Sequence, residues 1–222
     1  PLLEETFRQF QERTGHTILE RYGMTEIGMH LSNPLHGERR AGTVGQPLPE
    51  AEIRICDEQD QPVGLDTPSG LQVRGPNVFL EYWKLPEKTA EEFTAEGWFR
   101  TGDIAQLDAN GTVMLVGRGK DVVISGGLNV YPKEVEQVLD ALPGVLESAV
   151  IGVPHPDFGE AVTAVVVPET GTTLDSSALI AAVREQLAGF KCPKTVHSLP
   201  ELPRNAMGKV QKNELRKQFG GG

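Results

Sequence analysis

The sequence predicts a two-part fold of the α/β and α+β classes, with the change from one part to the other near Gly117. Residues 42–116 are rich in glycine, proline and short apolar runs, which is typical of a small β-barrel or sandwich. After Gly117, strand-like and helix-like patterns mix without a strict β-α-β alternation, and this indicates a compact α+β domain. The expected domains are therefore residues 1–118 and residues 119–222.

The elements of the first part follow from the spacing of its apolar residues. Residues 1–20 have the periodicity of an amphipathic helix, and residues 17–22 resemble a short strand that enters a turn at Gly23. Strands are expected over the apolar runs at residues 52–56, 70–73, 104–107 and 112–116. The Asp-Ala-Asn-Gly sequence at residues 108–111 is a hairpin turn signal between the last two runs.

The second part is expected to begin with a glycine-rich hairpin and to end with a helix. The expected elements are a hairpin over residues 122–130, a helix over 133–142, strands over 148–153 and 162–167, a helix over 176–188, a strand over 195–199 and a helix over 212–219. Asp175 is placed to cap the helix at 176–188, because a short acidic side chain accepts hydrogen bonds from the free N–H groups of a helix start.

The composition excludes several classes of protein. Of the 222 residues, 38% are hydrophobic and 23% are charged, which suits a globular protein and not a disordered or membrane chain. The net charge of −10 is opposite in sign to that of most nucleic-acid binders. The longest apolar runs, residues 149–153 and 161–167, fall far short of the roughly 20 residues that span a bilayer. With only Cys56 and Cys192, a reducing compartment is expected, either the cytoplasm or an organelle matrix.

The first segment with chemical potential is Tyr22-Gly23-Met24-Thr25-Glu26. An aromatic ring can stack on a base, and a glycine lets the backbone approach a ligand closely. A threonine hydroxyl can bind a phosphate oxygen, and a glutamate can hold Mg²⁺. A strand-to-helix turn with a capping threonine fits the same residues equally well.

The second segment, residues 98–103, ends in a Gly-Asp pair after an aromatic strand. A carboxylate at Asp103 can accept hydrogen bonds from both hydroxyl groups of a ribose. Gly-Asp pairs are also common in ordinary turns, and the residues by themselves favour that interpretation.

The third segment, residues 117–136, lies where the texture of the sequence changes. Small and charged residues at the end of an element can absorb a hinge rotation. Gly126 and Gly127 leave room for a thin substrate arm beside the backbone. The alternative is a glycine-rich linker followed by a hairpin.

The fourth segment, residues 203–209, is a loop that ends in Lys209 shortly before the last expected helix. An ammonium group on a flexible stem suits the neutralisation of charge that develops on a carboxylate and a phosphate. Most lysines, however, are simply solvated at the surface.

In their order and spacing, these four segments resemble the motifs of the adenylate-forming enzymes, which include acyl-CoA synthetases, luciferases and the adenylation domains of peptide synthetases. The resemblance runs through essentially all 222 residues. It implies the end of a large AMP-binding domain with a β-barrel subdomain, followed by a mobile C-terminal domain. It also implies an AMP-forming acid–thiol ligase that uses ATP and Mg²⁺ to make an acyl-adenylate and then transfers the acyl group to coenzyme A.

The resemblance assigns a role in the ATP site to each matching position of the first part. Tyr22 would stack on adenine, and Thr25 would contact a phosphate. Glu26 would hold Mg²⁺. Asp103 would bind the ribose hydroxyls with help from Arg118.

The resemblance also assigns roles to the mobile domain. Lys209 would bridge the carboxylate and the α-phosphate during adenylation, and Lys120 would be the hinge. Gly126 and Gly127 would line the pantetheine tunnel after the domain turns, so that one active site serves two half-reactions.

Within the family, several stretches are similar to the malonyl-CoA synthetases, so malonate or methylmalonate is the expected acid. These stretches are residues 20–26, 32–34, 37–45, 132–136 and 152–160. Arg39 and Arg40 are candidates for binding the second carboxylate of malonate, but both are more simply explained as structural or solvated arginines. A medium-chain fatty acid or an aryl acid is the alternative substrate, and a non-catalytic binding module that keeps the fold is the alternative function.

The family's phosphate-binding loop and most of its acyl pocket have no counterpart in these residues. The chain is therefore expected to be a truncated part of the enzyme, whose partner is the upstream half of its own AMP-binding domain. By itself it is expected to be inactive in both half-reactions.

Overall fold

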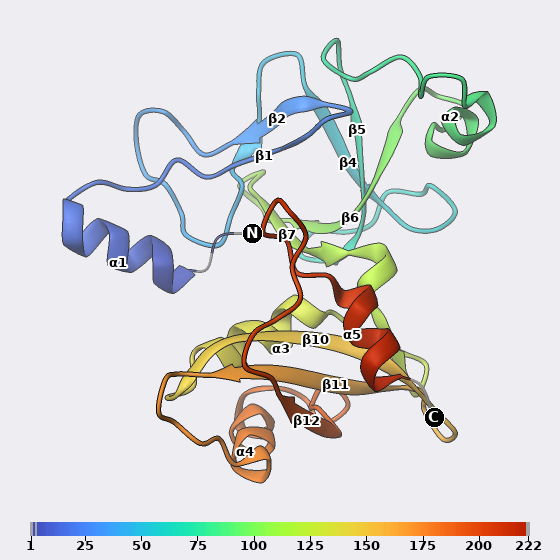
Figure 1. The fold of residues 1–222 in the computed structure, drawn as a ribbon. Coiled ribbons are helices and arrows are strands. Elements are labelled where there is room, and N and C mark those ends of the chain that lie inside the picture. The colour runs from blue at the N-terminus through green and yellow to red at the C-terminus, as the bar shows by residue number, and fades with distance from the viewer. Residues whose placement is uncertain (1, 3, 221–222) are drawn as a thin grey trace. The chain divides into compact units, whose positions relative to one another are not determined.

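The computed structural model describes residue 2 and residues 4–220 (Figure 1). The chain divides into two compact units, Pro1–Gly119 and Lys120–Gly222, and each unit is described by itself. Both units combine β-sheets with a few helices, which confirms the mixed α/β and α+β fold class. No helix in the described part of the chain is both long and apolar enough to cross a membrane.

The first unit contains two antiparallel sheets. Its elements are α1 (Glu4–Thr14), β1 (Arg21–Met24), β2 (Gly28–Ser32), β3 (Gln46–Pro47), β4 (Glu52–Cys56), β5 (Ser69–Arg74), α2 (Pro86–Glu92), β6 (Phe99–Leu107) and β7 (Val113–Arg118). One sheet has the strand order β1-β2-β3, and the other has the order β4-β5-β6-β7. An isolated bridge between Gly45 and Val113 connects them. The strands β3 to β7 begin in the segment, residues 42–116, where the sequence predicts a small β-barrel or sandwich.

The two sheets of the first unit share one apolar core. Its buried residues are Tyr22, Ile27, Leu31, Val44, Ile55, Leu71, Val73, Phe99, Ala105 and Val113. Phe99 also packs against the rings of Phe79 and Phe93, with centroids 5.2 and 5.3 Å away. This core holds β1 against the second sheet, because Tyr22 lies in it.

Three predicted elements of the first unit differ from the structure. The helix expected over residues 1–20 is α1, which ends at Thr14, and residues 1 and 3 lie outside the described part. The strand expected over residues 17–22 begins only at Arg21 and continues through Gly23, where a turn was expected. The strand expected over residues 104–107 begins at Phe99, because the segment that resembles a turn is held between two neighbouring strands.

The second unit is a five-stranded sheet covered by helices. The short 3-10 helix η1 (Gly119–Asp121) lies at the division between the units. It is followed by β8 (Val123–Ser125), β9 (Leu128–Val130), α3 (Pro132–Asp140), β10 (Val145–His155), β11 (Gly159–Pro168), α4 (Ser176–Gln186), β12 (Thr195–Ser198) and α5 (Lys212–Phe219). All the predicted elements of this part are present, and Asp175 caps α4 by accepting a 2.8 Å hydrogen bond from the Ser177 N–H.

Both faces of the sheet in the second unit are buried, because β10 and β11 are apolar at successive positions. On one face, Val162, Ala164 and Val166 of β11 pack with residues of α3 and α4. On the other face, Ala149 and Ile151 of β10 pack with Leu215 of α5 and with its neighbours. The helices therefore lie on opposite sides of the sheet, α3 and α4 on one and α5 on the other (Figure 1).

Candidate functional site

The first unit holds a buried carboxylate, that of Asp103, between two donors. The Tyr22 hydroxyl donates to Oδ2 at 2.6 Å, and the Arg118 Nε donates to Oδ1 at 2.8 Å. Only 7% of Asp103 is accessible to solvent. The structure therefore brings together three residues that the sequence places far apart, each on a different strand.

The register of the second sheet explains why Asp103 and Arg118 meet. They are direct partners across the antiparallel pair β6 and β7. Gly102 has a φ of +72° within β6, a conformation that glycine adopts without strain. The Thr101 hydroxyl accepts a 3.1 Å hydrogen bond from the Asp103 N–H. This local bend fixes the backbone from which the Asp103 side chain extends.

Electrostatics keeps the Tyr22 phenol protonated. Burial raises the pKa of Tyr22 well above its usual range, and the adjacent negative charge of Asp103 raises this pKa further. A phenol that stays protonated remains a hydrogen-bond donor to the carboxylate. Both oxygens of Asp103 therefore accept from side chains of the first unit, Oδ2 from Tyr22 and Oδ1 from Arg118.

Glu26 and Thr25 lie in the turn after β1. Thr25 is exposed, and Glu26 is half-buried. The Tyr82 hydroxyl donates to Glu26 Oε1 at 3.0 Å, and the Phe79 N–H donates to the Glu26 carbonyl at 2.7 Å. Burial, together with this hydrogen bond to the Glu26 carboxylate, raises the pKa of Tyr82 to about 12.

Tyr82 was not among the site residues predicted from the sequence. It lies 56 residues from Glu26 in the chain, so no local spacing connects them. The one signal available was an aromatic pair, Tyr82-Trp83, in a segment otherwise typical of a loop.

Lys209 ends a tight hairpin loop in the second unit. The loop closes through a bridge between Arg204 and Val210. Asn205 stabilises the loop, because its Oδ1 accepts hydrogen bonds from the N–H groups of Met207 at 3.0 Å and of Lys209 at 2.9 Å. The Asn205 N–H also donates to the Lys209 carbonyl at 3.0 Å. The result is an exposed lysine on an ordered backbone.

The Gly126-Gly127 pair forms the turn between β8 and β9. Both residues have positive φ, +59° and +78°, as a two-residue turn of type I′ requires. The Gly126 N–H donates to the Phe158 carbonyl at 2.8 Å, and a side chain at Gly127 would meet no neighbouring atom. The turn is therefore anchored on one side and open on the other.

Lys120 is exposed in η1 and is the first residue of the second unit. Its neighbour Asp121 is ion-paired with Arg216 of α5, with a separation of 2.8 Å. This ion pair connects Asp121, the residue after Lys120, to helix α5 of the second unit.

Arg39 and Arg40 both have structural partners. Arg39 donates to the backbone carbonyls of Thr17, Pro34 and Leu35 at 2.6, 3.1 and 2.9 Å. Arg40 is ion-paired with Asp108 at 2.7 Å. These contacts agree with the simpler interpretation of the two arginines as structural residues.

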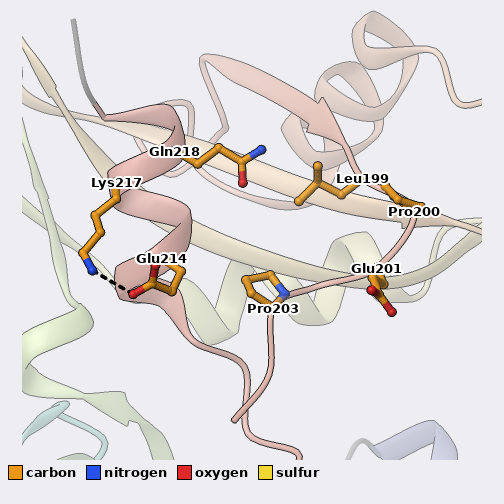
Figure 2. Close-up of a pocket in the computed structure, with 7 residues that line it drawn as sticks. All are labelled: Leu199, Pro200, Glu201, Pro203, Glu214, Lys217 and Gln218. Atoms are coloured by element: carbon orange, nitrogen blue, oxygen red, sulfur yellow. Dashed lines mark hydrogen bonds and ion pairs between the residues drawn. The ribbon is translucent and has the colours of Figure 1, made fainter.

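A groove of about 490 Å³ lies between α5 and the segment before the Lys209 loop (Figure 2). It is lined by Leu199, Pro200, Glu201, Pro203, Glu214, Lys217 and Gln218. None of the predicted site residues lines it. Figure 2 shows Lys217 paired with Glu214 along one wall, on the outer side of α5.

Known proteins resemble this chain over almost its whole length. The malonate–CoA ligase ACSF3 of mouse mitochondria (Mus musculus) is 44% identical over 239 residues, which cover 99% of this chain and 40% of that protein. The long-chain-fatty-acid–CoA ligase of Escherichia coli O157:H7 is 39% identical over 222 residues, which cover 100% of this chain and 39% of that protein. The chain thus spans about two fifths of the length of the curated relatives it matches.

Among solved structures, ATP-bound MatB from Rhodopseudomonas palustris matches with a TM-score of 0.96 and 52% identity, over 99% of this chain and 44% of that one. The apo structure of the same protein matches with the same identity and coverage but with a TM-score of 0.77. The two MatB structures therefore differ from one another in conformation.

Two family models match successive parts of the sequence. The model for AMP-binding enzymes matches residues 1–83, and the model for the AMP-binding enzyme C-terminal domain matches residues 134–209. Lys209 is the last residue of the second match. Because the two models describe parts of one type of enzyme and together match more than half of the chain, the chain belongs to the AMP-binding enzyme family.

Proposed function

We propose that this chain supplies the C-terminal part of an AMP-forming acid–CoA ligase, with malonate as the favoured acid. The observation that carries the proposal is the buried carboxylate of Asp103, which Tyr22 and Arg118 hold in a fixed orientation. Such a carboxylate can accept hydrogen bonds from two vicinal hydroxyl groups, like those of a ribose. The malonate–CoA ligases among the relatives support the choice of acid.

In this proposal the first unit binds the nucleotide. Asp103 accepts hydrogen bonds from the ribose hydroxyls, and Arg118 both orients Asp103 and offers positive charge beside it. Tyr22 holds the carboxylate through its hydroxyl. Only 7% of the residue is exposed, so at most a small area of its ring stacks on adenine. The exposed hydroxyl of Thr25 contacts a phosphate oxygen.

Mg²⁺ would be held by Glu26. Among the described residues, no group of three or more His, Cys, Asp or Glu side chains could hold a metal ion. A single carboxylate fits Mg²⁺ nonetheless, because this ion usually takes one or two carboxylates together with phosphate oxygens and water. The Tyr82 hydroxyl occupies Oε1 of Glu26 and so orients the carboxylate. When bound, the ion would neutralise phosphate charge.

The second unit would supply Lys209 to the first half-reaction. A carboxylate oxygen of the acid attacks the α-phosphorus of ATP, the new oxygen–phosphorus bond gives the acyl-adenylate, and pyrophosphate leaves. The Lys209 ammonium neutralises charge on the carboxylate and the α-phosphate as the bond forms. In the second half-reaction the thiol of CoA attacks the acyl carbon, the thiol proton is lost, and AMP leaves.

The two half-reactions would use different faces of the second unit. The division between the units falls between Gly119 and Lys120, and this supports Lys120 as the hinge. The open side of the Gly126-Gly127 turn suits a narrow ligand such as pantetheine. The different conformations of apo and ATP-bound MatB support a rotation of this kind.

The compartment proposed for the protein is a reducing one, the cytoplasm or an organelle matrix. Cys56 and Cys192 are both free and buried, which agrees with a setting where disulfides do not form.

The catalytic proposal can be tested with a chimera in which this chain replaces the matching 44% of R. palustris MatB. With ATP and malonate, we expect the chimera to release pyrophosphate at a rate within about tenfold of intact MatB. A folded chimera that releases no pyrophosphate above background would overturn the proposal. The same result would favour the non-catalytic binding module.

The choice of acid needs a separate experiment, because most of the acyl pocket of the chimera belongs to MatB. The complete gene product is assayed with malonate, methylmalonate, octanoate and ferulate, and kcat/KM is compared. We expect the highest value for malonate. A higher value for octanoate or ferulate would reassign the protein to the fatty-acid or aryl-acid ligases.

A further inference from the structure

Arg204 lies at the foot of the Lys209 loop and binds two separate parts of the second unit. Its Nη1 donates to the carbonyl of Gly208 at 2.7 Å, the residue directly before Lys209. Its Nη2 is paired with the carboxylate of Glu147. A guanidinium can make both contacts at once because its N–H donors point in fixed directions in one plane.

Glu147 joins this contact to the sheet of the second unit. It lies near the start of β10 and is paired with Val167 of the neighbouring strand β11. Two and four residues further along the same face, Ala149 and Ile151 are buried beside α5. Arg204 therefore connects the tip of the loop to the sheet, whereas the hydrogen bonds of Asn205 connect the loop only to itself.

We propose that Arg204 is a positioning residue for Lys209. By holding the Gly208 carbonyl toward Glu147, it sets the direction in which the Lys209 side chain leaves the loop. This inference rests on the proposed role of Lys209 in adenylation. A displacement of about 1 Å in a catalytic group can slow a reaction about 100-fold, so a small change in the loop has a large effect.

If Arg204 positions Lys209, loss of the Arg204 side chain should lower activity but hardly change stability. The side chains of Arg204 and Glu147 are 42% and 29% accessible, and ion pairs this exposed contribute little to the free energy of unfolding. Arg204 also touches no reacting group. Its loss should therefore slow adenylation, spare the thiol step in which Lys209 takes no part, and leave the melting temperature within roughly 2 °C.

The experiment uses the MatB chimera and measures the two half-reactions separately, as pyrophosphate release and as thioester formation from supplied malonyl-adenylate and CoA. For Arg204→Ala, we expect kcat of pyrophosphate release to fall about 10- to 100-fold, with the KM for ATP and the rate of the thiol step within about twofold. Arg204→Lys should recover part of the loss. Glu147→Gln should lose less, because Arg204 keeps its bond to Gly208.

Lys217→Ala is the matched control. It also removes a cation from an ion pair of the second unit, but Lys217 and its partner Glu214 are 74% and 49% accessible and lie on α5. Neither residue contacts the Lys209 loop through a hydrogen bond or ion pair among the described residues. We expect both half-reactions to be unchanged.

A second measurement, amide hydrogen exchange, uses the 222-residue chain itself and does not depend on activity. The N–H groups of Gly208 and Lys209 are bonded to Asn205. Arg204→Ala should speed their exchange about tenfold, because the loop loses its tie to the sheet. The Val150 N–H, bonded to buried Glu136, should exchange as before.

Unchanged adenylation by Arg204→Ala, or an equal loss in both half-reactions, would overturn the inference. So would unchanged exchange at Gly208 and Lys209. A parent chimera that does not adenylate would count against the proposed function instead. The exchange result would then still decide whether Arg204 orders the loop that carries Lys209.

Discussion

Replacing Tyr22 with phenylalanine tests whether the buried carboxylate cluster holds the first unit together. The change removes one hydrogen bond of 2.6 Å to an ionised carboxylate and leaves the ring in place. Hydrogen bonds to charged groups contribute about 1.5–3 kcal/mol, so Tyr22→Phe should lower the free energy of unfolding of the first unit by about this amount at pH 8.

The effect of Tyr22→Phe should depend on pH in a defined direction. An unfolded tyrosine has a pKa of about 10, and burial beside Asp103 raises the pKa of Tyr22 in the folded state above that value. Above pH 10 the unfolded state therefore loses a proton that the folded state keeps. The stabilising contribution of Tyr22 is complete below pH 10 and falls by up to about 1.4 kcal/mol per pH unit above it. The difference between wild type and Tyr22→Phe should vanish roughly one to two pH units above 10.

Tryptophan fluorescence during urea unfolding measures this difference, because both tryptophans of the chain, Trp83 and Trp98, lie in the first unit. Trp98 is buried between the guanidinium groups of Arg54 and Arg74 and should report unfolding strongly. A difference below about 0.5 kcal/mol at pH 8, or one that stays constant from pH 9 to pH 11, would refute the reasoning.

Four further predictions concern the second unit and the chain as a whole. Lys209→Ala in the MatB chimera should slow pyrophosphate release by about 10²–10³-fold and spare thioester formation from supplied acyl-adenylate; equal losses would contradict separate roles in the two steps. Lys120→Ala should slow the CoA step more than adenylation, and an unchanged CoA step would count against the hinge. The 222-residue chain alone, given ATP and malonate, should release no pyrophosphate above background, and robust turnover would contradict its proposed status as part of a longer active site. Lys212→Met leaves the carboxylate of Glu136, 7% exposed, without its 2.6 Å partner, and should destabilise the second unit by about 3–5 kcal/mol in a thermal melt followed by circular dichroism. The double variant with Glu136→Gln should recover part of that loss.

Much of the fold of the second unit could be predicted, because its elements follow from local patterns. The runs of buried valines in β10 and β11 and the cap at Asp175 are visible in the sequence and present in the structure. In the first unit α2 was not predicted, since none of its residues is buried and it has no apolar stripe. The start of β6 was misjudged because its Gly-Asp pair has the composition of a turn, while the neighbouring strands β5 and β7 keep it in the sheet.

The site residues could be proposed from the sequence, but most of their partners could not. The contact between Tyr22 and Asp103 spans 81 residues, and that between Tyr82 and Glu26 spans 56. Such contacts depend on strand register, and the register of β6 against β7 shifts between Ile104 and Ala105, next to Asp103. A shift of one residue would turn the side chain to the other face of the sheet. No local pattern in the sequence specifies this irregularity.

The bonds that hold Asp103 and the bonds that order the Lys209 loop belong to different units of the chain. Tyr22 and Arg118, which hold the carboxylate of Asp103, both lie before Lys120 in the chain. Arg204, Glu147 and Asn205, which order the Lys209 loop, lie after Lys120. A rotation about Lys120 would therefore break none of these bonds, and the orientation of each group would survive the movement. The free-energy cost of the proposed rotation would then fall on the few residues around η1. This is why Lys120→Ala and Arg204→Ala should act on different half-reactions, although both residues belong to the second unit.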